Sequence, residues 1–349
     1  MMKFGIIGSG SWGTALAKIL TDNNNSISWW IRSDKTISHF KNRRHNPHYL
    51  NSAYFDTNLL HLTTEVGEVI NNVDCIIIVV PSAYTVEVLG TLPKDIFRNK
   101  KIVSAVKGIL PGNNLLLNDY LKEEFGVALK DYFTVLGPCH AEEVAAEKLS
   151  YLTFSGVDEQ TTTDIASHFK TPYLNTIHNT DIYGVQYAAV LKNIYAIGAG
   201  IAHGLEYGDN FLSVLIANSA DEMAGFLRKA GIQNVEVGTI DHANPNIKVE
   251  RRHTTNYAAS VYLGDLLVTC YSLYSRNRTF GNMIGKGYSV QAAQLEMSMV
   301  AEGYNASKCM YTINKEVSAE MPIAETIYKI LWEQLSPEEG FQEIEKSLV

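Results

Sequence analysis

Residues 4–13 read FGIIGSGSWG, an apolar run followed directly by the spacing G-x-G-x-x-G. In this motif the first glycine makes a tight turn, the second lets the backbone approach a pyrophosphate, and the third allows close helix–strand packing. Glycines in turns are common, but a place between an apolar run and a helical stretch favours a dinucleotide site, with phosphates at the helix N-terminus. The candidate cofactor residues of this stretch are Gly8, Gly10, Ser11, Trp12 and Gly13.

Beyond this turn, the first half of the chain alternates short apolar runs with helical stretches. Near-continuous apolar or β-branched runs are typical of parallel strands buried on both faces. Their alternation with segments such as 14–21 and 86–89 predicts a doubly wound, parallel α/β sheet. The expected strands are 4–7, 27–31, 75–80, 101–105 and 132–136.

The pattern of the sequence changes near residue 180. Later stretches are long, rich in Ala, Leu, Ile and Met, and helical in period, which predicts an all-α C-terminal region. Because 349 residues exceed the usual size of one core, we expect a dinucleotide-binding domain over 1–180 and a helical substrate and catalytic domain over 181–349. The expected helices are 183–202, 211–230, 257–274, 289–304 and 323–335.

Composition and charge narrow the class of protein. A net charge of -8 argues against a general affinity for nucleic acid or for an anionic membrane, both of which select a basic face. The four cysteines are spread along the chain without a CxxC pair, and no His cluster has metal-ligand spacing, so we expect reduced thiols and no metal. The first apolar run follows Met1-Met2-Lys3 directly, and the apolar run 75–80 is short. These features predict a cytoplasmic protein without a signal peptide or a membrane span.

The segment after the second expected strand bears on the choice of cofactor. NAD enzymes usually carry an acidic residue there to bind the ribose 2′-hydroxyl. Arg32 stands at that position and suits a 2′-phosphate, which favours NADPH. Alternatively, Arg32 is a solvated loop residue and Asp34 serves the ribose, so NADH stays open. Tyr49 offers an aromatic face to the adenine side, although an exposed loop tyrosine is the simpler interpretation.

Carbonyl reduction needs a proton donor near the oxygen that receives charge. Lys192 lies in the otherwise apolar helical stretch 187–197, where desolvation would lower the pKa of its ammonium toward neutrality. A lysine that snorkels to the surface along the helix is an equal alternative from composition alone. Lys192 is the candidate general acid.

Two further segments carry groups that suit a phosphorylated substrate. Asp265 and Thr269 share one helix face, so the carboxylate is placed to orient Lys192 or a substrate hydroxyl. The segment 275–277, Ser-Arg-Asn, offers donors suited to a phosphate dianion. A helix cap at Asp265 and a surface salt bridge at Arg276 are the structural alternatives.

Together these motifs resemble those of one family, the bacterial NAD(P)-dependent glycerol-3-phosphate dehydrogenases. The matching stretches run in order through almost the whole chain, and the ordered set is far more specific than any single member. They are GIIGSGSWGTALA (5–17), VPS (80–82), SAVKGI (104–109), LGPCHAEEVA (136–145), LKNIYAIGAGIAHG (191–204), GDN (208–210), LGDLLVTC (263–270), SRNRTFG (275–281) and MVAEGY (299–304).

The resemblance implies a Rossmann domain followed by a helical domain, often in a homodimer. It also implies an oxidoreductase that reduces dihydroxyacetone phosphate reversibly to sn-glycerol 3-phosphate with NADPH or NADH. The product would feed phospholipid synthesis. The alternatives are a related two-domain dehydrogenase of another small oxyacid and a non-catalytic dinucleotide sensor.

The same resemblance implies residue roles. Lys192 is similar to the family's general acid/base on the C2 oxygen, Lys107 to the residue that touches both cofactor and substrate, and Asp265 to the carboxylate that positions Lys192. The implied substrate contacts are Lys107, Gly137, Cys139, Lys192, Asp265, Ser275, Arg276 and Asn277. The further implied cofactor contacts are Lys107, Ala141, Arg276, Val300 and Glu302.

Three residues depart from the family's usual pattern. Cys139 stands where Ser or Thr is usual, and a thiol is a poorer hydrogen-bond donor than a hydroxyl. His140 replaces the phenylalanine of many members, although histidine also occurs there. Tyr262 adds bulk where the approach to the GDL motif is usually small. These changes bear on substrate geometry and leave the expected reaction class intact.

Overall fold

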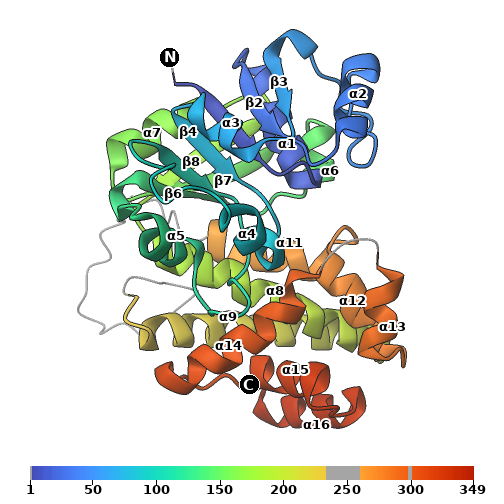
Figure 1. Cartoon of the computed structure of the whole chain (residues 1–349). Coiled ribbons are helices and arrows are strands. Elements are labelled where there is room, and N and C mark those ends of the chain that lie inside the picture. Colours follow the sequence, from blue (N-terminus) through green and yellow to red (C-terminus); the bar gives the residue numbers. More distant parts are fainter. Residues whose placement is uncertain (1, 233–259, 298–300) are drawn as a thin grey trace, which may run out of the picture.

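The computed structural model describes residues 2–232, 260–297 and 301–349. A sheet with helices on both faces forms the first part of the chain, and a group of packed helices forms the second (Figure 1). The sheet has the order β3-β2-β1-β4-β5-β6-β7-β8, and every neighbouring pair is parallel except β6 and β7. Its strands are β1 (Phe4–Ile7), β2 (Ile27–Trp30), β3 (Leu60–Thr63), β4 (Cys75–Ile78), β5 (Lys101–Ser104), β6 (Tyr132–Leu136), β7 (Ser150–Ser155) and β8 (Leu174–Asn179).

Alternate side chains of the central strands enter two different cores. Cys75 and Ile77 of β4 belong to the core on one face of the sheet, and Ile76 and Ile78 belong to the core on the other. All four are fully buried, which explains why β4 reads as a continuous apolar run. The helices that accompany the sheet are α1 (Ser11–Asp22), α2 (Asp34–Arg43), α3 (Val66–Asn71), α4 (Ser82–Leu89), α5 (Leu117–Phe125), α6 (Ala141–Ala145) and α7 (Glu159–Ser167), with 3-10 turns η1 (Thr57–Leu59) and η2 (Leu129–Asp131).

The predicted fold class and the five predicted strands are confirmed. Three strands, β3, β7 and β8, were not predicted. The edge strands β3 and β8 are partly exposed and carry residues such as His61, Asn175 and His178, so neither presents an apolar run. The antiparallel pairing of β7 with β6 also departs from the all-parallel expectation.

The second part of the structure is helical, as expected, and α8 runs through its centre (Figure 1). None of the helices within the described ranges combines the length and apolarity needed to cross a bilayer. The helices are α8 (Ile182–Gly204), α9 (Asp209–Lys229), α11 (Asp265–Tyr271), α12 (Arg276–Gly285), α13 (Val290–Glu296), α14 (Glu302–Val317), α15 (Pro322–Trp332) and α16 (Pro337–Ser347), with a π-helical turn η3 (Ser260–Gly264) before α11.

Two predicted helices are corrected. The expected helix over 289–304 is two helices, α13 and α14, because the backbone is extended at Met297 and Ala301. The expected helix over 257–274 ends at Tyr271, where Ser272 turns to an extended conformation; residues 257–259 lie outside the described part of the chain. Ser275 then caps α12 by accepting a hydrogen bond from the Arg278 N–H (3.3 Å).

Helices α8 and α12 meet backbone to backbone through glycines. A Cβ on Gly200 of α8 would lie 2.1 Å from the Arg278 carbonyl oxygen, and a Cβ on Gly281 of α12 would lie 2.0 Å from the Ile197 carbonyl oxygen. Any larger residue at these positions would force the helices apart. The contact places the start of α12 close to the middle of α8.

Glu222 of α9 holds the start of α15. Its two carboxylate oxygens accept hydrogen bonds from the backbone N–H groups of Ile323 (2.8 Å) and Ala324 (2.9 Å), and from the Tyr195 hydroxyl (3.1 Å). Burial raises the pKa of Glu222 to about 7. This side chain replaces a local cap, since Met321 at the N-cap makes no side-chain hydrogen bond.

We expect Glu222→Ala to lower the free energy of unfolding by about 2–3 kcal/mol at pH 8, because two buried N–H groups lose their acceptor. Urea unfolding with an unchanged m-value measures the effect. Glu325→Ala is the matched control. It removes a part-exposed carboxylate that pairs with Lys329 on the same helix, and its cost should stay below about 1 kcal/mol. Equal costs for the two variants would contradict the capping role.

Candidate active site

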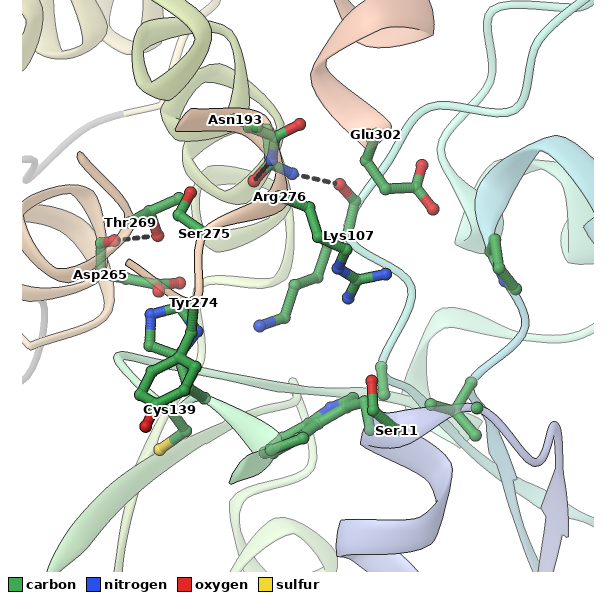
Figure 2. A pocket seen from close by; sticks show the side chains of 18 of the residues that line it. Ser11, Lys107, Cys139, Asn193, Asp265, Thr269, Tyr274, Ser275, Arg276 and Glu302 are labelled. Carbon is green, nitrogen blue, oxygen red and sulfur yellow. Dashed lines mark hydrogen bonds between the residues drawn. The ribbon is translucent and has the colours of Figure 1, made fainter. Parts of the chain in front are cut away.

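A cavity of about 170 Å³ lies where the sheet meets the second set of helices. Loops that follow β1, β4, β5 and β6 form one side, and residues of α8, α11, α12 and α14 form the other. Figure 2 shows the side chains of Lys107 and Arg276 pointing into the space between Asp265 and Glu302. The crevice beyond the carboxyl ends of the strands is the usual ligand site of an open α/β sheet.

The glycine turn after β1 fits a dinucleotide. Gly8 has a φ of +124°, which side chains rarely adopt, and a Cβ on Gly13 would lie 2.3 Å from the Gly8 carbonyl oxygen. A Cβ on Gly10 would meet nothing within 4 Å, and no side chain caps the start of α1. The turn therefore leaves an open approach to the uncapped N–H groups of α1, which is the arrangement that a pyrophosphate requires.

Trp12 and Lys107 meet across the cavity floor. The Lys107 ammonium lies 5.2 Å from the centre of the Trp12 ring, within the range of a cation–π interaction. The Trp12 Nε1 atom is closed to water and has no partner in the described part of the chain. Trp12 thus lines the cavity with a ring that contacts the Lys107 cation, while its indole N–H is buried without a partner among the described residues.

Arg32 and Tyr49 lie outside the cavity lining. Arg32 is exposed just beyond β2, on the edge of the sheet that carries the glycine turn. Tyr49 belongs to a loop that Asn46 ties to that turn. The Asn46 Nδ2 donates to the Ser9 carbonyl (3.0 Å), and its Oδ1 accepts from the Tyr49 N–H (3.3 Å).

Lys192 and Asp265 form a buried ion pair between α8 and α11, with side chains 4% and 2% exposed. Burial is the main cause that lowers the pKa of Lys192, Asp265 opposes it, and the nearby Lys107 cation adds to the lowering; together they bring the pKa to about 8. The second carboxylate oxygen, Oδ2 of Asp265, has no partner among the described residues. The pair gives the cavity an ammonium group that can release its proton close to neutral pH.

A directional chain of hydrogen bonds joins both sides of the cavity. The Gly303 N–H donates to Asn277 Oδ1 (2.9 Å), Asn277 Nδ2 donates to Asn193 Oδ1 (2.9 Å), and Asn193 Nδ2 donates to the Lys107 carbonyl (3.1 Å). This amide relay links α14, α12 and α8 to the loop after β5. Asn277 lines the cavity, but its side-chain amide is already engaged in the relay.

Glu302 joins the two parts of the chain at another point. Its carboxylate accepts hydrogen bonds from the Ser82 N–H (3.1 Å) and the Ser82 hydroxyl (2.5 Å), so it caps α4 from the start of α14. Burial raises the pKa of Glu302, while Ser82 and then the Arg276 cation lower it. Val300, also expected at the cofactor, lies outside the described residues.

The loop after β6 brings Cys139 to the cavity. Its thiol donates to the Tyr151 carbonyl (3.2 Å), and burial raises the pKa of Cys139 to about 12, so it stays a thiol. Gly137 has a φ of +142°, and a Cβ there would lie 2.8 Å from the same carbonyl. Gly137 thus shapes the loop from behind the lining, while Ala141 opens α6 and lines the cavity.

The structure gathers most of the expected site residues around one cavity. These are Gly10, Ser11, Trp12, Lys107, Cys139, Ala141, Lys192, Asp265, Ser275, Arg276, Asn277 and Glu302. Gly8, Gly13 and Gly137 act behind the lining. Ser82 and Asn193 lay within the quoted family stretches, but neither was singled out, because only tertiary contacts reveal their partners.

Three features together define a class of protein, the two-domain NAD(P)-dependent dehydrogenases. They are the sheet, the glycine turn that follows β1, and the buried lysine–carboxylate pair. Comparison with known protein families identifies one family within this class. The family model described as NAD-dependent glycerol-3-phosphate dehydrogenase N-terminus matches residues 3–162, and the corresponding C-terminus family model matches residues 181–342. The chain therefore belongs to the NAD-dependent glycerol-3-phosphate dehydrogenase family.

Individual relatives agree. The chain is 32% identical to a glycerol-3-phosphate dehydrogenase [NAD(P)+] of Streptococcus pneumoniae over 328 residues, covering 94% of this chain and 91% of the relative. It is 30% identical to the enzyme of the same name from Enterococcus faecalis, covering 98% and 95%. The crystal structure of glycerol-3-phosphate dehydrogenase from Coxiella burnetii superposes with a TM-score of 0.85 at 27% identity, covering 98% of each chain.

The glycine turn allows a paired test. We expect Gly10→Val to weaken NADPH and NADH binding more than about tenfold, because the side chain fills the open approach, while stability changes by about 1 kcal/mol. Gly13→Ala should instead lower stability by about 1–3 kcal/mol through its clash with Gly8. Cofactor titration and urea unfolding separate the two effects.

Gly225→Ala, where a Cβ meets nothing within 4 Å, is the control. Unchanged cofactor affinity in Gly10→Val would contradict this placement.

Proposed function

We propose that the chain is an NAD(P)-dependent glycerol-3-phosphate dehydrogenase that reduces dihydroxyacetone phosphate reversibly to sn-glycerol 3-phosphate. The observation that carries the proposal is the buried Lys192–Asp265 pair, which faces the same cavity as the glycine turn and the start of α12. A proton donor, a dinucleotide-binding turn and a phosphate-binding helix end thus border one space. The names of the bacterial relatives agree with this reaction.

The residues that would hold the cofactor come from both parts of the chain. The start of α1 at Gly10 and Ser11 offers N–H groups to the pyrophosphate, and Trp12 and Glu302 line the same cavity. When bound, the reduced nicotinamide supplies the hydride that carbonyl reduction at C2 requires. We propose that Arg32, which is exposed beyond β2, favours a 2′-phosphate and hence NADPH.

Lys192 acts as the general acid. Hydride addition at C2 turns the carbonyl oxygen into an alkoxide, and the Lys192 ammonium donates its proton to that oxygen. Asp265 holds the ammonium in place, and Lys107 adds positive charge where the negative charge develops. In the reverse direction the neutral amine takes the proton from the C2 hydroxyl.

The start of α12 binds the phosphate. Arg276 is exposed at the cavity edge, and Ser275 and Asn277 flank it with buried side chains. Ser275 already accepts a hydrogen bond from the Arg278 N–H, so the remaining N–H groups of the first turn and the positive end of the helix dipole are what favour a dianion. Because the Asn277 side chain belongs to the amide relay, its contribution is the backbone N–H and the position of the helix.

The resemblance supplies the wider setting of the proposal. We place the reaction in the cytoplasm, in a homodimer of chains with domains over 1–180 and 181–349. Its product supplies glycerol phosphate for phospholipid synthesis.

The direct test is oxidation of NADPH and of NADH with dihydroxyacetone phosphate and with unphosphorylated dihydroxyacetone. We expect turnover with the phosphorylated compound and little with the other, because phosphate binding orients the carbonyl. Lys192→Met should lower kcat by about 10²–10⁴ while cofactor affinity is kept. Lys329→Met, a part-exposed lysine on α15, is the control. No turnover by the folded, cofactor-binding protein would defeat the proposal.

The pH profile tests the ion pair. Reduction needs the Lys192 ammonium, so kcat/KM for reduction should fall as pH rises through about 8, the lowered pKa of this group, while oxidation should rise. Asp265→Asn removes the carboxylate that raises the pKa of Lys192, so the fall should move to lower pH. Glu142→Gln, a second carboxylate of the cavity lining, should leave it in place. A profile of Asp265→Asn that is unmoved or moved to higher pH would contradict the pairing.

A further inference from the structure

Dihydroxyacetone phosphate has three polar ends, and the proposed function assigns partners to two of them. The phosphate lies at the start of α12, and the C2 oxygen lies at Lys192. The terminal hydroxyl on C1 has no assigned partner. The inference below rests on the proposed function and concerns this third end.

Most of the neutral polar side chains around Lys192 already make hydrogen bonds. The Thr269 hydroxyl donates to the Asp265 carbonyl (2.6 Å), and the Cys139 thiol donates to the Tyr151 carbonyl (3.2 Å). The amide of Asn193 is held at both ends in the relay. Each of these groups already makes at least one hydrogen bond, so the Thr269 or Asn193 oxygen would accept from a substrate hydroxyl only beside a bond already made.

His140 is different. It lines the cavity directly before α6, with its ring centre 5.9 Å from that of Tyr274. Burial and then the cations of Lys107 and Lys192 lower the pKa of His140, which favours the neutral form of the ring. A hydrogen bond with the backbone of Val268 opposes this shift, as an N–H donated to a carbonyl does. A neutral imidazole has one donor and one acceptor nitrogen. Nε2 of His140 is closed to water and has no hydrogen-bond partner among the described residues, so it is the nitrogen that carries the free lone pair.

We propose that His140 is a specificity-determining residue that accepts a hydrogen bond from the terminal hydroxyl of the substrate. The neighbouring cations oppose protonation of the ring, which keeps the acceptor lone pair available. A rival acceptor exists in Oδ2 of Asp265, which also has no partner among the described residues. Both acceptor atoms are closed to water, but Asp265 is already paired with Lys192, whereas Nε2 of His140 belongs to a side chain that is itself only partly buried. A methyl group in place of the hydroxyl would leave the His140 nitrogen unpaired.

The test compares dihydroxyacetone phosphate with hydroxyacetone phosphate, which carries a methyl group in place of the hydroxymethyl group. The full chain is assayed with NADPH as wild type, His140→Phe and His140→Asn. We expect His140→Phe to lower kcat/KM for dihydroxyacetone phosphate by about tenfold or more and to leave hydroxyacetone phosphate nearly unchanged. His140→Asn keeps a hydrogen-bonding group near the same place, so it should restore much of the preference. Tyr274→Phe keeps the neighbouring ring and should leave the substrate ratio unaltered.

The outcomes separate this inference from the function on which it rests. Equal losses for both substrates in His140→Phe would show a packing role only and overturn the inference, leaving Asp265 as the acceptor. Cofactor KM and the unfolding midpoint show whether the variant is intact. A wild-type chain that reduces neither substrate would defeat the proposed function, and this inference with it.

Discussion

The backbone contact between α8 and α12 sets the geometry on which the site depends. Because Gly200 and Gly281 carry no side chains, each helix lies against the other's carbonyl groups, at a distance that no other residue permits. Helix α12 begins at Arg276, so the same contact fixes the start of α12, the proposed phosphate site, relative to Lys192. Rigid elements position reacting groups better than loops do, and here both groups stand on helices.

Polar bonds then attach this helical pair to the sheet. Glu302 caps α4 through Ser82, and the amide relay ends on the carbonyl of Lys107. Both connections lie at the cavity, so a displacement of either part would alter the lining itself. Cofactor and substrate would therefore meet in a space whose two walls are held by the same hydrogen bonds.

The sequence alone predicted those parts of the fold that a local residue pattern determines. The strands buried on both faces and the glycine turn were predictable, because each is encoded within a few neighbouring residues. The edge strands β3 and β8 were not, since partial exposure removes their apolar pattern, and the break between α13 and α14 has no Gly or Pro to mark it. Within the site, the sequence motifs predicted Lys192 and Asp265. They did not predict the hydrogen bond between Ser82 and Glu302, because these residues are 220 positions apart and only the fold brings them together.

Under the proposed function, the buried ion pair would let one lysine serve both directions of a reversible reaction. A lysine buried alone would lose its proton too readily, and one strongly paired in water would hold it too tightly. Burial and Lys107 lower the pKa of Lys192 while Asp265 raises it, and the balance leaves it at about 8. At neutral pH the ammonium then predominates for reduction, and a usable fraction of neutral amine remains for oxidation. Because Asp265 has one oxygen without a partner among the described residues, its environment already differs from that of a purely structural salt bridge, in which both oxygens would be satisfied.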